Sequence, residues 1–294
     1  MEHELKQVLS VSRRTDIPAF YMPWFMQGVD RGTIAVENPF NRQVRQVPVS
    51  PDRVHAMVFW SKNFGPFLQG GYGERLQTMG YHLLFNFTIN SQVPELEPAV
   101  PPLDQRLDQL RQLCRHFGPQ AVQWRFDPIC HYVMPTGEIR TNLADFGTIA
   151  EAARGAGIGT CVTSFMDHYA KIRRRTRGRL TFIDPTMAEK CGLLMELERI
   201  LLPLGIQLNL CCEKDVLAHL PLSTTIRAGA CISGPRIVTL YGGHVSLRAD
   251  AGQRRAAGCG CTQSVDVGSY RLHPCHHNCL FCYANPAGDG KGPA

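Results

Sequence analysis

The chain has 294 residues, of which 44% are apolar and 19% are charged, and its formal net charge is +6. This composition excludes a disordered or collagen-like chain, because enough apolar side chains are present to form a core. No stretch approaches the roughly 18 consecutive apolar residues of a membrane span. The polar residues 1–6 also lack the apolar segment of a signal peptide. We therefore expect a cytoplasmic protein with no membrane contact.

Short apolar runs alternate with segments of helical spacing through most of the chain. Seven strands are predicted, at residues 7–12, 33–37, 55–60, 81–88, 121–126, 159–165 and 206–211. Residues 44–49 are expected to pair with 33–37 as a hairpin. Helices are predicted at 18–28, 66–79, 103–117, 143–156, 185–204 and 213–220, with Asn142 as the N-cap of the fourth. Residues 236–241 are interpreted as an eighth strand or a tail element.

This alternation predicts a parallel α/β fold. About seven repeats favour a (β/α) barrel, complete or partial, of the TIM-barrel type. A doubly wound open sheet is the alternative, which is disfavoured because no glycine-rich phosphate motif follows the first strand. The predicted domains are a barrel over residues 1–220, a cysteine-rich segment over 221–285 packed on the barrel mouth, and a disordered tail over 286–294.

Polar and charged residues follow nearly every predicted strand. In a (β/α) barrel such residues meet at one mouth, at the carboxyl ends of the strands. The candidates for catalysis are Arg13, Asp16, Lys62, Arg125 and Asp127. The candidates for cofactor or substrate binding are Glu37, Asn38, Asn63, Asn86, Asn90 and Phe281. A mutual ion pair is the simpler explanation for Arg125 and Asp127.

Three cysteines form a CxxxCxxC motif near the C-terminus: Cys275, Cys279 and Cys282, with Phe281 before the last. Three thiolates can hold three irons of a 4Fe–4S cluster and leave the fourth iron open to a ligand. The motif resembles that of radical S-adenosylmethionine (SAM) enzymes, although there it usually lies near the N-terminus. The resemblance implies that the open iron binds SAM, that one electron from a donor such as flavodoxin or ferredoxin cleaves it, and that a 5′-deoxyadenosyl radical results. His276 and His277 are interpreted as spacers.

Other cysteines form a second candidate site. Cys212, Cys231, Cys259 and Cys261 are predicted to hold a second 4Fe–4S cluster or a structural zinc ion. The alternative for Cys231 is a small buried hydrophobic residue. Cys211 is expected to point into the barrel wall, because side chains alternate along a strand. The remaining cysteines, Cys114, Cys130, Cys161 and Cys191, are interpreted as packing residues.

A basic run crowds six cations into residues 171–179. Such a run attracts phosphate or nucleic acid, although a solvated helix end is the commoner explanation. It suggests a phosphate-bearing substrate. It also leaves open a zinc- or Fe–S-stapled nucleic-acid-binding protein without SAM chemistry. A further alternative is a barrel hydrolase that uses Asp127 or Glu37, with a structural cluster.

Five stretches together resemble one bacterial family, domain of unknown function 1848. They are residues 10–18 (SVSRRTDIP), 60–63 (WSKN), 85–90 (FNFTIN), 124–128 (WRFDP) and 259–285. The resemblance covers about residues 7–285. It implies a C-terminal cysteine cluster similar to that of radical SAM proteins, and it implies no reaction. The expected function is therefore that of a radical SAM-type enzyme with an unknown substrate.

Overall fold

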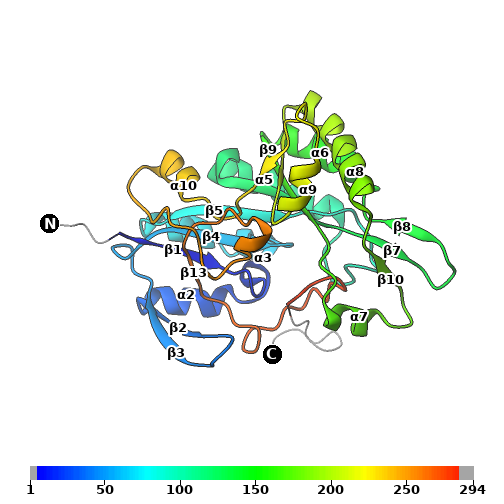
Figure 1. Cartoon of the computed structure of the whole chain (residues 1–294). Coiled ribbons are helices and arrows are strands. Elements are labelled where there is room, and N and C mark those ends of the chain that lie inside the picture. The colour runs from blue at the N-terminus through cyan, green and yellow to red at the C-terminus, as the bar shows by residue number, and fades with distance from the viewer. Residues whose placement is uncertain (1–4, 285–294) are drawn as a thin grey trace.

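A computed structural model describes residues 5–284, so the predicted disordered tail over 286–294 lies outside the described residues. Its main feature is an eight-stranded sheet in which all neighbouring strands are parallel (Figure 1). In spatial order the strands are β12 (Arg227–Ala228), β11 (Gln207–Leu210), β9 (Thr160–Phe165), β6 (Val122–Ile129), β5 (His82–Thr88), β4 (Val54–Ser61), β1 (Gln7–Val11) and β13 (Val265–Asp266). The predicted parallel α/β fold is thus confirmed.

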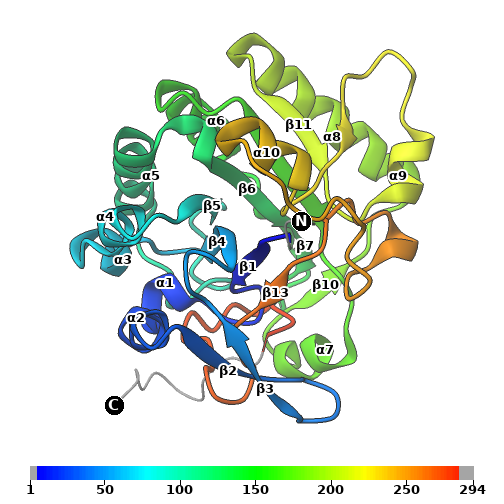
Figure 2. The same cartoon turned by 90° about the vertical axis from the view of Figure 1, so that its left-hand side faces the viewer.

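Helices cover the outer face of the sheet, as Figure 2 shows. They are α1 (Ile17–Phe20), α2 (Met22–Asp30), α3 (Gly65–Gln69), α4 (Tyr72–Thr78), α5 (Leu103–Phe117), α6 (Phe146–Gly155), α8 (Met187–Leu201) and α9 (Lys214–His219). The apolar faces of these helices pack on the sheet. In α5, for example, Leu107, Leu110 and Leu113 recur at helical spacing and are buried against the sheet. Parallel strands are near-continuous apolar runs, because both of their faces must be covered. Short 3₁₀ turns occupy Pro119–Ala121, Leu202–Leu204 and Arg255–Ala257.

The inner face of the sheet is covered by a later segment. Helix α10 (Gly234–Tyr241) and the residues after it place Ile237 and Val245 against Val8, Ala56 and Val58. The interpretation of 236–241 as a strand or tail element is therefore corrected to a helix. Its start is set by Ser233, whose side chain accepts a hydrogen bond from the backbone N–H of Arg236.

Two small antiparallel sheets and one further helix complete the fold. One sheet is the hairpin of β2 (Thr33–Glu37) and β3 (Val44–Pro48). The other joins β7 (His131–Val133) to both β8 (Ile139–Thr141) and β10 (Thr181–Ile183), and the helix is α7 (Ala170–Thr176). The hairpin pairing is confirmed, but β2 is not a strand of the main sheet, so its predicted place as the second barrel strand is wrong.

The predicted N-cap of the fourth helix is corrected. Helix α6 begins at Phe146 with Asp145 at its N-cap. Asn142 instead accepts from the backbone N–H of Cys130 and donates to the carbonyl oxygen of Pro128.

A closed barrel is not shown: within residues 5–284 no pairing joins the edge strands β12 and β13. No helix in the described part of the chain is long and apolar enough to cross a membrane.

Candidate functional site

The CxxxCxxC motif lies in a loop that runs between α2 and α7 (Figures 1 and 2). Cys279 is buried, and Cys275 and Cys282 are half-buried. Asn278 adopts a left-handed backbone conformation, with φ of 55°, which asparagine tolerates better than most residues. The three predicted ligands thus lie on one largely buried loop.

A buried carboxylate attaches this loop to the sheet. One oxygen of Asp16 lies 2.8 Å from Nε2 of His277, and both side chains are almost fully buried. Asp16 also accepts from the Ser61 hydroxyl, from the backbone N–H of Lys62 and from that of Ala19. It thereby joins the ends of β1 and β4 to the cysteine loop. His277 is thus more than a spacer, and Asp16 acts through its neighbours as a positioning residue.

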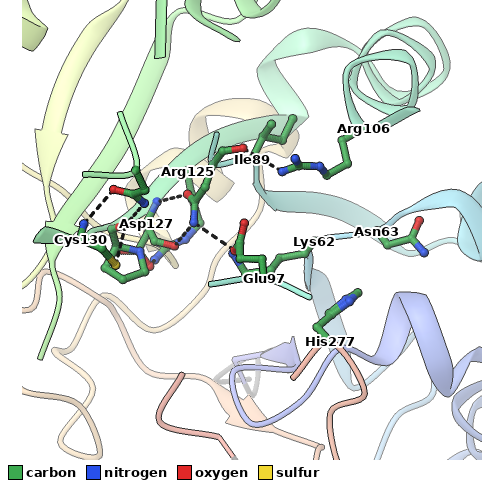
Figure 3. Close-up of polar contacts among 12 residues, drawn as sticks. Lys62, Asn63, Ile89, Glu97, Arg106, Arg125, Asp127, Cys130 and His277 are labelled. Carbon is green, nitrogen blue, oxygen red and sulfur yellow. Dashed lines mark hydrogen bonds and ion pairs between the residues drawn. The ribbon is translucent and has the colours of Figure 1, made fainter. Parts of the chain in front are cut away.

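A buried ion pair lies beside the loop, where Figure 3 shows Lys62, Glu97 and His277 close together. Nζ of Lys62 is 2.5 Å from Oε1 of Glu97 and 5.3 Å from the ring centre of Phe281. Burial would lower the pKa of Lys62, but the charge of Glu97 and its hydrogen bond outweigh it and raise this pKa. Burial raises the pKa of Cys279 well above its ordinary value, against the opposing charge of Lys62. Lys62 is therefore a permanent cation next to a thiol that stays protonated without a metal.

Helix α7 holds the loop from the other side. Nη1 of Arg175 donates to the carbonyl oxygens of Cys279, Leu280 and Cys282 at 3.0–3.1 Å. Lys171 donates to the carbonyl oxygen of Tyr283. Two cations of the basic run are thus used to fix the cysteine loop, which the sequence alone did not indicate.

Five thiols meet at the inner face of the sheet. Sγ of Cys211 lies 3.8 Å from that of Cys212 and 3.6 Å from that of Cys231. Further thiol contacts join Cys212 to Cys259, Cys259 to Cys261, and Cys261 to Cys231. The four predicted cysteines therefore do come together. The expectation that Cys211 points away into the wall is wrong, because its thiol belongs to the same group.

Two arginines flank this thiol group. Nη1 of Arg125 donates to Sγ of Cys231, and its Nη2 lies 2.5 Å from Oδ2 of Asp127. The expected ion pair of Arg125 and Asp127 is thus confirmed. Arg13 and Arg125 also lie over the ring of Trp60, at 5.3 and 5.1 Å. Burial would raise the pKa of Asp127, but Arg125 and a hydrogen bond from Ser164 hold it below its ordinary value.

A chain of polar contacts links the two cysteine groups, and Figure 3 shows its members Arg125, Asp127, Glu97 and Lys62. Asn90 accepts from the backbone N–H of Asp127 at 2.8 Å and donates to Oε1 of Glu97 at 3.2 Å. Since Arg125 bonds to Asp127 and Lys62 bonds to Glu97, the contacts extend from Cys231 to the surroundings of Cys279. Glu97 was not predicted, although it is an acid in a proline-rich loop.

The other predicted polar residues have local partners. Glu37 pairs with Arg271 at 2.6 Å, and Asn38 accepts from the backbone N–H of Phe40 in the β2–β3 turn. Asn63 accepts from the backbone N–H of Gly65 at the start of α3. Asn86 donates to the carbonyl oxygen of Cys231. Of this set, Asn86, Asn90 and Phe281 contact the cysteine groups or the polar chain between them.

Two cavities in the described part of the chain do not resemble a ready cofactor pocket. One of about 190 Å³ is lined by Glu97, Arg106 and residues of the proline-rich loop 92–102. A larger one, about 410 Å³, lies between α3 and α5 and is lined by none of the twelve cysteines. Among the residues described, no three His, Cys, Asp or Glu side chains are already arranged around a single metal ion.

Comparison with known proteins places the chain in one family. A family model described as "Domain of unknown function (DUF1848)" matches residues 8–284. No curated protein matches the chain.

Proposed function

The chain belongs to this family of unknown function, and from its own residues we propose that it is a radical SAM-type enzyme. In this proposal Cys275, Cys279 and Cys282 hold one 4Fe–4S cluster. The observation that carries the proposal is the position of three thiols on one largely buried loop, beside the carboxyl ends of parallel strands β1 and β4. Those strand ends are where parallel α/β proteins place their active sites.

The donor set fits a cluster in three respects. The ligands are thiols at CxxxCxxC spacing, they lie in a largely buried loop, and cations surround them. The backbone N–H of Ala284 also lies 3.4 Å from Sγ of Cys282, as a donor to a thiolate ligand would. A cube distributes its thiolates over separate irons. The three sulfurs therefore do not need to converge on one point, as they would for a single ion.

When bound, such a cluster supplies SAM with the electron for its reductive cleavage. The residues of the chain prepare the place for it. Lys62 favours the thiolate form of Cys279 by its charge, and Arg175 holds the loop by its carbonyl oxygens. Asp16 and His277 fix the loop against the sheet. Their burial keeps water away from a reactive species.

Lys62, Asn90 and Glu97 are our candidates for contacts with SAM or the substrate, because they lie beside the loop. The adjacent cavity of about 190 Å³ is below the roughly 300–1,000 Å³ of typical ligand pockets. We therefore expect the proline-rich loop 92–102 to move when SAM binds. A cytoplasmic location and an electron donor such as flavodoxin or ferredoxin belong to the same proposal.

Two alternatives have less support. The nucleic-acid-binding hypothesis relies on the basic run, in which Lys171 and Arg175 are engaged in holding the cysteine loop while the other four cations are exposed. The hydrolase hypothesis needs a carboxylate able to take a proton. Asp127 is tied to Arg125 and Ser164, and Glu37 is paired with Arg271 at the β2–β3 hairpin. The phosphate-bearing substrate is less supported to the same extent, because two of the six cations hold the loop.

The test is anaerobic reconstitution with iron and sulfide, followed by incubation with SAM and dithionite. We expect a brown protein that releases 5′-deoxyadenosine, measured by mass spectrometry. Cys279→Ala should abolish the product, whereas Cys191→Ala on the remote helix α8 should not. Product formation by Cys279→Ala, or none by a wild-type chain shown to carry a 4Fe–4S signal, would contradict the proposal.

A further inference from the structure

We propose that Cys211, Cys212, Cys231, Cys259 and Cys261 form a second metal centre, bound by at least four thiolates and closed to substrate. Its occupant belongs to the soft, thiolate-binding class, which is zinc or an iron–sulfur cluster. The five thiols come from three separate segments and meet at the inner face of the sheet. This inference concerns a different group of residues from the CxxxCxxC loop and does not depend on SAM chemistry.

The backbone at Cys212 is the first argument. Consecutive residues of an extended strand point to opposite sides. Cys212 instead has a left-handed φ of 61°, which is uncommon for residues other than glycine. As a result the thiols of Cys211 and Cys212 point to the same side and lie 3.8 Å apart. The chain thus adopts an unfavourable conformation at the residue where it brings two neighbouring sulfurs together.

The sulfur spacing is the second argument. Four sulfurs at about 2.3 Å from a zinc ion form a tetrahedron with edges of about 3.8 Å. The two sulfur–sulfur distances at Cys211 are 3.8 and 3.6 Å. Both distances match an edge of such a tetrahedron.

The hydrogen-bond donors around the sulfurs are the third argument. Arg125 donates to Sγ of Cys231, and the backbone N–H of Ile232 lies 3.4 Å from Sγ of Cys261. Nη2 of Arg13 is buried and has no hydrogen-bond partner among the described residues. Donors directed at sulfur are typical of the surroundings of metal-bound thiolates.

Apolar packing is the competing explanation. Several of these cysteines are buried with Val8, Ala56 and Val58, and a free cysteine can act as a small hydrophobic residue. Packing accounts for burial. It does not account for five mutually contacting thiols beside a guanidinium group, or for the left-handed backbone of Cys212. A closed set of thiolates leaves no open position, so we assign this centre to structure or electron transfer rather than to substrate binding.

The experiment uses the full chain with the first motif removed by Cys275→Ala, Cys279→Ala and Cys282→Ala. Purified without air, this triple variant should retain about one metal centre per chain, measured as zinc and iron by mass spectrometry. X-ray absorption should show a shell of sulfur neighbours at about 2.3 Å. The visible spectrum tells an iron–sulfur cluster from zinc. Both occupants support the inference, and a folded triple variant without stoichiometric metal overturns it.

Replacing two ligands tests the assignment to these residues. Cys212→Ser with Cys259→Ser, in the same background, should lower the metal content at least tenfold, whereas Cys191→Ser should leave it unchanged. Unaltered metal in the folded double replacement would overturn the assignment. If the double replacement does not fold, the sulfur shell of the triple variant still decides the question. Failure of SAM cleavage in the wild type would leave these metal measurements unaffected, so the two proposals fail separately.

Discussion

Asp16 offers the sharpest test of how the cysteine loop is held. Replacing it with alanine removes the N-cap of α1, at a cost of about 1 kcal/mol. It also leaves the buried backbone N–H of Lys62 and the ring of His277 without their acceptor, at about 1–3 kcal/mol each. We therefore expect Asp16→Ala to lower the free energy of unfolding by about 3–7 kcal/mol, which few single replacements reach.

Asparagine at this position should cost less. Its amide oxygen can still accept from Ala19, and its NH₂ group can donate to His277 if the imidazole changes tautomer. Only the contact with the N–H of Lys62 becomes unfavourable, so Asp16→Asn should cost about 1–3 kcal/mol.

Urea unfolding of the metal-free, reduced protein, followed by tryptophan fluorescence, measures both free energies. Asp30→Ala is the matched control, because Asp30 forms an exposed ion pair with Arg75 that contributes at most about 1 kcal/mol. A change below about 1 kcal/mol in Asp16→Ala, or a larger loss in Asp16→Asn than in Asp16→Ala, would refute the reasoning.

Three other replacements probe separate parts of the structure. Arg175→Ala removes three hydrogen bonds to loop carbonyl oxygens, and we expect about tenfold faster loss of iron to a chelator after reconstitution. Gly260→Ala places a Cβ atom 3.0 Å from the carbonyl oxygen of Gly229, which should cost about 1–3 kcal/mol in urea unfolding. His82 is stacked on Tyr241, and burial lowers its pKa below the ordinary value of 6.5. The unfolded chain therefore binds more protons below that pH, and stability falls as the pH drops through the pKa of the folded state. His82→Phe should reduce this acid sensitivity, measured as the urea midpoint between pH 7 and pH 5.

Each of these has a control in the chain. Arg174→Ala, at the exposed residue next to Arg175, should leave iron retention unchanged. Gly192→Ala lies within α8 with no atom near the added Cβ, so it should stabilise by about 0.5–1 kcal/mol. His219→Ala, at the exposed C-terminal residue of α9, is the matched histidine replacement. Equal effects in a variant and its control would contradict the corresponding prediction.

The parallel sheet could be predicted because its strands are continuous apolar runs, as in β4, where seven of eight residues are buried. The hairpin strand β2 is also a short apolar run, and the sequence does not reveal its pairing partner. It was therefore assigned to the wrong sheet. Residues 236–241 contain β-branched and aromatic residues that favour strands. The preceding Ser233-Gly234-Pro235 is a helix start, and this local signal was the better guide.

In the candidate site, the CxxxCxxC spacing predicts which cysteines share one loop. The residues that hold this loop against the rest of the protein could not be predicted. Asp16 and His277 are separated by 261 positions, and nothing local to either indicates the other. Arg175 was hidden within a basic run that is equally consistent with a phosphate site. Cys211 was excluded by strand alternation, which fails because the backbone turns left-handed at the next residue.

The position of β13 and the cysteine loop has a consequence for biosynthesis. Strand β13 is the last strand of the sheet along the chain, and the cysteine loop follows it. Yet β13 pairs directly with β1, the first strand. Translation proceeds at about 5–20 residues per second. More than 250 residues must be synthesised before β13 can pair with this edge of β1. The loop thiols emerge after that. Insertion of any metal at Cys275–Cys282 is therefore a late maturation event, and the nascent chain presents an unpaired strand edge until then.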